Sequence, residues 1–354
     1  MLSQTPSAPQ PRHVTVGLYL NDVATLDQTT GSFGADFYLW FRWQGNWTTG
    51  DVNSTVAADI ATAKASPTGS FSQLAEYALP THFELMNGQV DALALIAAQP
   101  DYNGSSYNFL EYRVHATMHD PMVLNNYPLD VQTLSIEIED SFYPNSTLVY
   151  VPDPGSSIDP SITSGNGIPG WRYDAGSFSI VVTNHLYATA FGYGVIPGLN
   201  TSSSYSHFDA SFTIRRPFAN AVTTLLLPVA ILLALTLVSF FISIDKFEER
   251  LALLVTAVLS AVLLQVNFAQ NIPASGSFTL ADRTIVVLYV VLVYGLAITV
   301  VQKWLNPEKH PRAVLWVDRV TVVIISIGAT IAIWWLFYSV CDARICSLPI
   351  GVSP

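Results

Sequence analysis

The chain has 354 residues, of which 50% are hydrophobic and only 12% are charged, and its formal net charge is −11. An ordinary soluble domain carries roughly 25% charged residues, so this composition excludes a purely soluble protein. The charge is uneven: residues 1–214 hold 19 Asp and Glu against 5 Lys and Arg, whereas residues 215–354 hold 7 against 10. An acidic domain concentrates cations at its surface and repels anions, although solubility alone explains such acidity equally well.

The chain from residue 14 to residue 215 shows strand patterns separated by Pro, Gly and Asn. The clearest lies at residues 35–43, where apolar side chains alternate with Tyr38, Trp40 and Arg42. Further strands of this kind are predicted at residues 14–20, 82–86, 93–98, 107–118, 132–139, 147–151, 178–186 and 206–215. One helix is predicted at residues 53–65. The first domain, residues 1–214, is therefore expected to be an all-β, immunoglobulin-like sandwich of about ten strands.

Four apolar segments follow in residues 215–354, and each is long enough to cross a hydrocarbon core of roughly 30 Å. The predicted spans cover about residues 218–243, 249–270, 282–304 and 314–340. Together they predict a second domain, a four-helix transmembrane bundle.

The loops between these spans predict the orientation. Lys246 and Arg250 lie between the first two spans, and Lys303, Lys309 and Arg312 lie between the last two. The positive-inside rule makes both loops cytoplasmic, so the N-terminal domain and the C-terminus are expected outside a cell membrane. An exported domain needs a signal peptide, which we expect to have been removed because residues 1–12 are polar.

The second span carries a stripe at spacings of 3 and 4 residues, which places its members on one helical face. The stripe consists of Glu248, Ala252, Thr256, Leu259, Leu263, Val266 and Gln270. The stripe begins with the charged Glu248, continues through mostly aliphatic side chains, and ends with the polar Gln270. This order predicts a helix that lines an ion pore when it is repeated around an axis. A lipid-facing or core helix is the alternative, but its stripe would be uniformly apolar.

The remaining chemistry is sparse. Cys341 and Cys346 either form a disulfide or stay free. Among the histidines, only His115 and His119 have a metal-like spacing, and no metal site is predicted. We find no nucleophile–base set and no phosphate-binding glycine loop. The sequence thus predicts no enzyme, no cofactor and no nucleic-acid partner.

Several segments resemble the pentameric ligand-gated ion channels. Tyr127-Pro128-Leu129-Asp130 resembles the loop between the sixth and seventh strands of that family, and Leu26-Asp27 with residues 35–41 resembles its first two strands. Arg215-Arg216-Pro217, followed by Pro228, resembles the entry to the first membrane helix. No cysteines flank the first loop, as in the bacterial branch. The resemblance implies a homopentamer around a central pore, in contact with membrane lipids.

For permeation, the resemblance implies that Glu248 and Glu249 form the selectivity site at the cytoplasmic mouth, where five carboxylates favour monovalent cations. Anion-selective relatives usually carry Pro-Ala at this position. The hydroxyl of Thr256 would contact a partly dehydrated ion, and the aliphatic stripe residues would exclude water in the closed state. Ala252 departs from the family, which often has a polar residue there.

For gating, the resemblance implies an interface between the two domains that moves when agonist binds. Its expected members are Asp27, Tyr127, Pro128, Asp130, Arg215, Arg216 and Pro273. Asp27 and Asp130 are expected to flank one of the two arginines. Pro228 removes a backbone donor and should loosen the first helix locally.

For the agonist, the resemblance implies a site between subunits, under a hairpin loop at residues 191–207. The expected lining residues are Tyr38, Trp40, Arg113, Glu139, Phe142, Tyr143, Tyr193 and Tyr205. Aromatic rings beside a carboxylate suit an amine. A proton is the alternative agonist, and divalent cations are expected modulators. A non-conducting membrane sensor is the rival interpretation, although the cytoplasmic loops are too short for an output domain.

Overall fold

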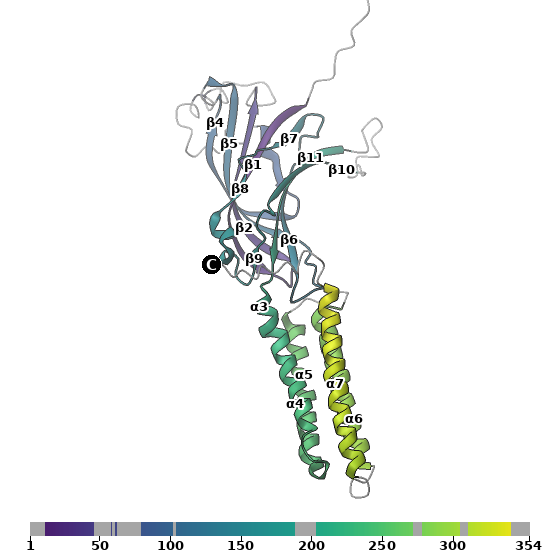
Figure 1. Ribbon diagram of the computed structural model, residues 1–354. Helices are drawn as coiled ribbons and strands as arrows, with labels where there is room; N and C mark the ends of the chain where they lie inside the picture. The colour runs from purple at the N-terminus through teal and green to yellow at the C-terminus, as the bar shows by residue number, and fades with distance from the viewer. Residues whose placement is uncertain are drawn as a thin grey trace, which may run out of the picture. The chain divides into compact units, whose positions relative to one another are not determined.

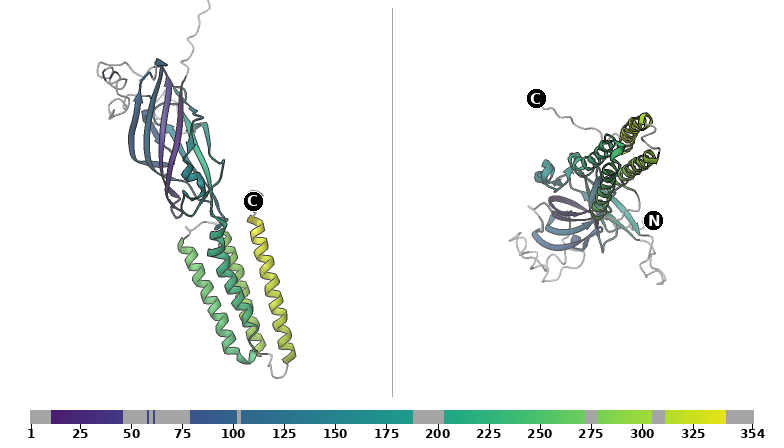
Figure 2. Two further views of the ribbon diagram at one scale, coloured as in Figure 1. Left: turned by 60° about the vertical axis from the view of Figure 1, so that its left-hand side comes forward. Right: turned by 90° about the horizontal axis from the view of Figure 1, so that it is seen from below.

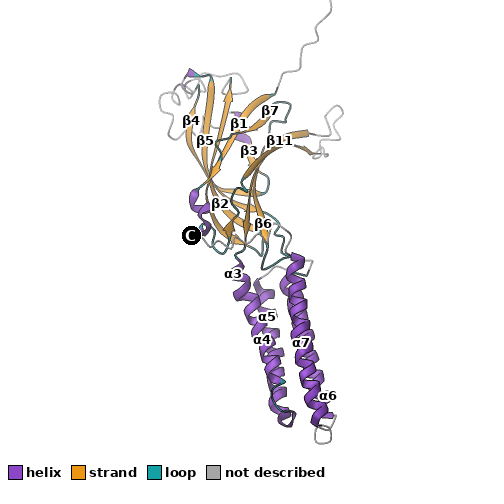
Figure 3. Cartoon of the chain, in the orientation of Figure 1, coloured by secondary structure: helices purple, strands orange, loops and turns teal. Residues whose placement is uncertain are grey.

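The computed structural model describes residues 11–45, 58, 61, 79–101, 104–187, 203–271, 278–304 and 311–340. The chain divides into two compact units. The first comprises Met1–Met122 with Gln132–Arg215, and the second comprises Val123–Val131 with Arg216–Pro354. Strands dominate the first unit and helices the second (Figure 3). The segment Val123–Val131 groups with the helices although it lies between two strands.

The first unit contains two sheets (Figure 1). The six-stranded sheet has the order β4-β5-β2-β1-β7, with β8 paired to β1, and the five-stranded sheet has the order β10-β11-β6-β3, with β9 paired to β11. The strands are β1 (Arg12–Asp27), β2 (Ser32–Gln44), β3 (Phe83–Leu85), β4 (Gly88–Gln99), β5 (Tyr107–His119), β6 (Val131–Asp140), β7 (Leu148–Pro152), β8 (Ser157–Ile158), β9 (Arg172–Tyr173), β10 (Ser179–Tyr187) and β11 (Ser203–Arg215). Short helical turns η1 (Leu79–His82) and η3 (Ile162–Asn166) connect some of them.

The inner faces of the two sheets share one hydrophobic core, as strict alternation along the strands requires. In β2, Phe37, Leu39 and Phe41 are completely buried, while the residues between them remain half-buried. Burying one such side chain stabilises the fold by about 1.5–3 kcal/mol. The predicted sandwich is confirmed. The strands β8 and β9 were not predicted, because two residues are too few to show alternation. Apart from Ala58 and Ala61, both helical, the predicted helix at residues 53–65 lies outside the described residues.

The second unit has four apolar helices long enough to cross a membrane, as the composition predicts (Figure 2). The first is built from α3 (Phe218–Ala221), the wider turn η5 (Val222–Leu226) and α4 (Leu227–Ser239). It is followed by η6 (Ile244–Lys246), α5 (Phe247–Asn271), α6 (Leu280–Trp304) and α7 (Pro311–Val340). Among these helices, α5 packs against α4 and α6, and α7 packs against α6.

The first apolar helix is irregular near Pro228. Its π-type turn η5 ends two residues before this proline, which has no N–H and crowds the carbonyl of the preceding turn. The helix ends at Ser239 rather than near residue 243. The backbone N–H of Phe240, the residue after the helix, donates to the carbonyl of Leu237 in its last turn. In the segment that follows, the hydroxyl of Ser243 accepts a hydrogen bond from the Asp245 N–H at 3.4 Å.

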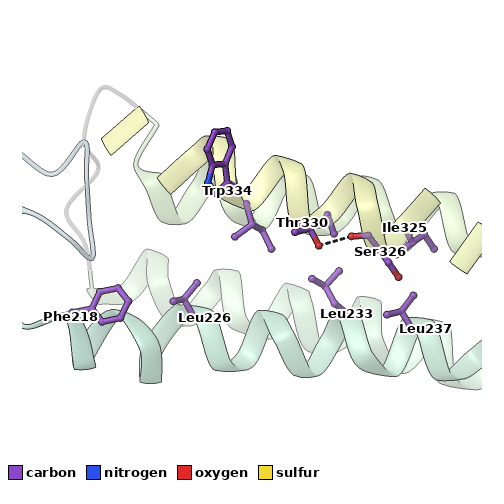
Figure 4. A pocket seen from close by; sticks show the side chains of 10 residues that line it. Phe218, Leu226, Leu233, Leu237, Ile325, Ser326, Thr330 and Trp334 are labelled. Carbon is purple, nitrogen blue, oxygen red and sulfur yellow. Dashed lines mark hydrogen bonds between the residues drawn. The ribbon is translucent and has the colours of Figure 1, made fainter. Parts of the chain in front are cut away.

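An apolar groove of about 610 Å³ runs between α4 and α7 (Figure 4). Leu233 and Leu237 line one side, and Ile325 and Trp334 line the other. Thr330 also lines the groove, but its hydroxyl donates to the carbonyl of Ser326 at 2.7 Å in its own helix. The lining is therefore almost entirely hydrocarbon.

Candidate functional site

The stripe predicted on the second span lies on one exposed face of α5. All seven of its residues are exposed in the single chain, with Leu259 at 60%, Leu263 at 63% and Val266 at 46%. The buried residues of α5 lie on the opposite side, where Leu254, Ala257 and others pack into the helical unit. The stripe thus faces away from the other helices of its own subunit.

The polar members of the stripe differ in what they contact. The Thr256 hydroxyl donates to the carbonyl of Ala252 at 2.8 Å, which leaves its oxygen lone pairs on the exposed face. Glu248 is exposed, and the neighbouring Glu249 lies 3.6 Å from the Lys246 ammonium with both side chains more than 60% exposed. A pair this exposed contributes little to stability. Gln270 is exposed near the end of the helix.

A buried ionic cluster lies behind the charged end of this stripe, and sequence reasoning missed it. Arg250 is completely buried within α5 and donates to Asp318 of α7 at 2.8 Å. Gln302 of α6 donates to the same carboxylate oxygen at 3.0 Å. The guanidinium carbon lies 4.2 Å from the Phe240 ring centroid. The signal available in the sequence was Asp318, which lies beside Arg319 within the fourth apolar span, since an intramembrane charge normally has a partner.

The loop Val123–Val131 is held against the helices of the second unit by a second buried pair. Arg216 donates to Asp130 through Nε at 2.7 Å and through Nη2 at 3.2 Å. The two side chains are 9% and 0% exposed. The guanidinium carbon also lies 4.8 Å from the ring centroid of Tyr127, and burial raises the pKa of that phenol above its usual range. Two parallel hydrogen bonds fix the orientation of the guanidinium relative to the carboxylate as well as the distance between them.

Backbone and apolar contacts complete this attachment. The N–H groups of Leu280 and Ala281, which begin α6, donate to the carbonyls of Asn125 and Tyr127 at 2.9 and 3.1 Å. The ring of Tyr127 packs edge-on against Phe268 of α5, with centroids 6.2 Å apart. Leu129 packs against Leu280. The loop therefore contacts the end of α5, the start of α6 and Arg216, two residues before the first helix.

The two adjacent arginines have different partners. Arg215 pairs with Asp174 at 2.9 Å within the strand unit, and both side chains are at least 40% exposed. Asp27 accepts a hydrogen bond from the Thr29 N–H at 2.8 Å in the β1–β2 turn, which lowers the pKa of its carboxyl. Asp130 thus pairs with Arg216, while Asp27 caps its own turn. Pro273, the last predicted member of this interface, lies outside the described residues.

The outer face of the six-stranded sheet carries three of the predicted agonist-site residues. The Trp40 indole N–H donates to Asp153 at 2.9 Å, and the Arg113 guanidinium forms two hydrogen bonds with Asp36 while lying 5.7 Å from the Tyr38 ring centroid. The Arg113 contact lowers the pKa of the Asp36 carboxyl. Trp40 lies across Gly17, where a Cβ would collide with its indole.

The outer face of the five-stranded sheet carries Glu139, a carboxylate only 2% exposed. His185 and His207 direct Nδ1 to its Oε1 at 2.6 and 2.8 Å, and the Tyr187 hydroxyl donates to its Oε2 at 2.9 Å. The ring of Tyr205 packs edge-on against Tyr187 with centroids 5.8 Å apart. Neither His185 nor His207 was predicted to belong to this site, because the resemblance does not point to them and only strand pairing brings them beside Glu139.

The other predicted agonist-site residues form a second aromatic group. Phe142 is 65% exposed, and its ring lies 5.0 Å from Tyr143 and 5.3 Å from His82. The turn that presents them is held by Asp140, which accepts the N–H groups of both residues. Tyr193 lies outside the described residues, as do the two cysteines.

Comparison with known proteins finds a partial similarity to a receptor subunit. No protein-family model matches the chain. A gamma-aminobutyric acid receptor subunit beta from Caenorhabditis elegans is 23% identical over 180 residues, which are 50% of this chain and 29% of that protein. The matched segment spans less than a third of that receptor subunit, and the four apolar helices of the chain, each long enough to cross a membrane, support a multi-pass membrane protein.

Proposed function

We propose that the protein is a ligand-gated, cation-selective ion channel, in which five copies of the chain surround a pore lined by α5. One observation carries the proposal. The stripe from Glu248 to Gln270 lies on the face of α5 opposite its packed side, and it is polar at both ends. A carboxylate, a hydroxyl and an amide in one row are energetically costly on a helix face that contacts only lipid, so lipid-facing helices rarely carry them.

Ion selection follows from the charged end of the stripe. In a pentamer, five copies of Glu248 would surround the mouth of the pore, with Glu249 beside each of them. A ring of carboxylates attracts cations and repels anions. Leu259, Leu263 and Val266 would form aliphatic rings that exclude water when the pore is closed. We assign Glu248 and Glu249 to the selectivity site.

Gating is proposed to pass through the loop Val123–Val131. This loop binds the end of α5 through Phe268, the start of α6 through two backbone hydrogen bonds, and Arg216 through Asp130. A displacement of the loop would therefore reach the pore helix directly. Asp27, Arg215 and Pro273 complete the proposed gating interface.

The agonist site is proposed to form between subunits. Tyr38, Trp40 and Arg113 lie on the outer face of one sheet, whereas Glu139 and Tyr205 lie on the outer face of the other. The shared core separates these faces, so they can meet only when two sandwiches adjoin. Aromatic rings beside a carboxylate suit an amine-like ligand, a class consistent with the receptor relative.

The remaining assignments follow the same proposal. Residues 1–214 would form the outer ligand-binding domain and residues 215–354 the pore domain, with both termini outside the cell membrane. The absence of cysteines in residues 119–134 favours the bacterial branch. Acyl chains of membrane lipids would fill the groove between α4 and α7.

The decisive experiment is the reversal potential of the reconstituted protein in planar bilayers under a KCl gradient, at neutral and acid pH and with added amines. A reversal toward the potassium equilibrium potential is expected, and Glu248→Ala should weaken it. Asp245→Ala, which removes an exposed carboxylate just before the same end of α5 and outside the stripe, is the matched control. Opening by acid alone would make the proton the agonist. A pentameric protein without current under any condition would favour a non-conducting sensor.

Cysteine accessibility tests the pore face separately. Leu259→Cys should react with a water-soluble thiol reagent in the open channel and block the current. Val258→Cys, one position away on a half-buried face, should not. Equal reaction at both positions would contradict the assignment of the stripe to the pore.

A further inference from the structure

We propose that Glu139, His185 and His207 bind a divalent transition-metal ion of the zinc class on the outer face of the five-stranded sheet. The site belongs to one subunit, and its occupancy does not depend on whether the protein conducts ions. Glu139 is also part of the proposed agonist site, so a bound ion would compete there with an amine.

The geometry comes from three neighbouring strands. Antiparallel pairing places His185 of β10 opposite Tyr205 of β11, and His207 is two residues further along the same face. Glu139 projects from β6, on the other side of β11. One ligand atom from each of the three side chains lies within 4.8 Å of the other two.

This donor set suits zinc. Two imidazole nitrogens and one carboxylate oxygen are a common zinc set, in which a water molecule takes the fourth position. Calcium and magnesium prefer oxygen ligands and larger or octahedral shells, so they should bind poorly. The present nitrogen–oxygen contacts of 2.6 and 2.8 Å are hydrogen bonds. Ligand atoms around a tetrahedral zinc lie roughly 3.3 Å apart, given bonds of about 2.0–2.1 Å. Small movements of the two imidazole rings would therefore make room for the ion. The ion would replace the protons that now lie between the histidine Nδ1 atoms and Glu139.

The surroundings also resemble those of a metal site. Glu137 lies 3.7 Å from Nε2 of His207, on the side of the ring away from Glu139. A carboxylate in this position orients a metal-binding imidazole and leaves its other nitrogen for the metal. The Tyr187 hydroxyl holds the second oxygen of Glu139.

The charge of Glu139 and the solvent exposure of His185 both favour binding of a divalent ion at this site. Among the described residues, the ionic partners of the buried Glu139 carboxylate are the two histidines alone. A buried carboxylate without a permanent positive charge is costly, and a divalent ion would compensate it. The His185 side chain is 46% exposed, which gives an ion a route from solvent.

The test is isothermal titration of zinc chloride into the full-length protein, purified in detergent and freed of metal with a chelator. The chain should carry Cys341→Ser and Cys346→Ser, because thiolates also bind zinc. We expect one zinc per subunit and a rise in the melting temperature on addition of zinc. Calcium chloride should produce neither effect.

The variants separate binding from folding. His185→Ala removes an exposed ligand and should weaken zinc binding at least tenfold without changing the melting temperature of the metal-free protein. Glu139→Gln should weaken it similarly, and Tyr187→Phe should weaken it less. His115→Ala, at an exposed histidine beside Asp36 on the other sheet, is the control and should bind zinc normally. Unchanged affinity in His185→Ala and Glu139→Gln, or equal binding of calcium, would overturn the proposal.

Discussion

The helical unit contains two buried arginine–aspartate pairs. They have similar surroundings but differ in how many donors of the guanidinium group have hydrogen-bond partners. In each, the guanidinium lies over an aromatic ring: Tyr127 for Arg216 and Phe240 for Arg250. Arg216 forms two hydrogen bonds with Asp130. Arg250 forms one with Asp318, and its Nε and Nη1 are buried without a hydrogen-bond partner among the described residues.

This difference indicates different roles. A buried ion pair stabilises only when its geometry is good and its remaining donors are satisfied. The first pair meets that condition and joins a loop to the helices. The second leaves two donors and the Gln302 carbonyl oxygen unsatisfied, so it stabilises less and instead fixes how α5, α6 and α7 align. Four predictions test the comparison, from the largest effect to the smallest.

The largest effect is expected from Asp130→Asn. It leaves the nearly buried Arg216 without a counter-charge, which should lower the free energy of unfolding by about 3–5 kcal/mol. Denaturant unfolding in detergent measures this, and agonist-evoked current should fall as well. The double variant Asp130→Asn/Arg216→Met should recover part of the loss. Additive losses in the double variant would show that the two side chains are not coupled.

Arg250→Met should have a smaller effect, about 1–3 kcal/mol, because it also removes two unsatisfied buried donors. The double variant Arg250→Met/Asp318→Asn, which keeps an acceptor for the buried Gln302 amide, should recover most of that loss. The same denaturation experiment compares the three proteins. A loss in Arg250→Met as large as that in Asp130→Asn would refute the difference between the pairs.

Asp140, in the strand unit, is a third buried carboxylate to compare with Asp130 and Asp318. It accepts hydrogen bonds from backbone N–H groups instead of pairing with an arginine. Burial raises its pKa, and its Oδ2 is buried without a hydrogen-bond partner among the described residues. A raised pKa in the folded state means that its contribution to stability is complete below about pH 4, the unfolded value, and is lost as the pH rises through the folded value.

Asp140→Asn keeps the acceptor for the Phe142 and Tyr143 N–H groups but carries no charge. The variant should therefore lose less stability than wild type between pH 4 and pH 7. Melting temperatures across that range measure the difference. Parallel curves for the two proteins would contradict a raised pKa.

The smallest effect is expected from Arg215→Ala. Its pair with Asp174 is at least 40% exposed on both sides, and such pairs contribute about 0–1 kcal/mol. Increasing the salt concentration should remove most of that contribution. The neighbouring Arg216→Ala, which breaks a buried pair, is the internal contrast. Equal losses at the two arginines would mean that burial does not distinguish them.

Local patterns predicted much of this molecule. The alternation in residues 35–43 indicated β2, and four long apolar segments indicated the four helices. The stripe of α5 follows from helical spacing alone, so its exposed face was predictable before the helix was placed. The resemblance to the channel family, rather than a local pattern, pointed to Asp130 and to one of the two arginines, without deciding between Arg215 and Arg216.

Contacts between distant residues were not predictable. Arg250 was assigned to a loop, since nothing near it in the chain indicates that Asp318, 68 residues away, is its partner. His185 and His207 looked like scattered histidines until strand pairing placed them beside Glu139.

The sequence by itself determined the periodic features: which face of each strand is buried, which segments are long enough to cross a membrane, and which row of side chains runs along α5. These depend on the fixed repeat of a strand or helix, which neighbouring residues specify. Only the tertiary structure decided which charges pair and which ligands converge, because those contacts depend on strand order and helix packing. Glu139 with its two histidines is the clearest case, since three strands must adopt one register before the three side chains meet.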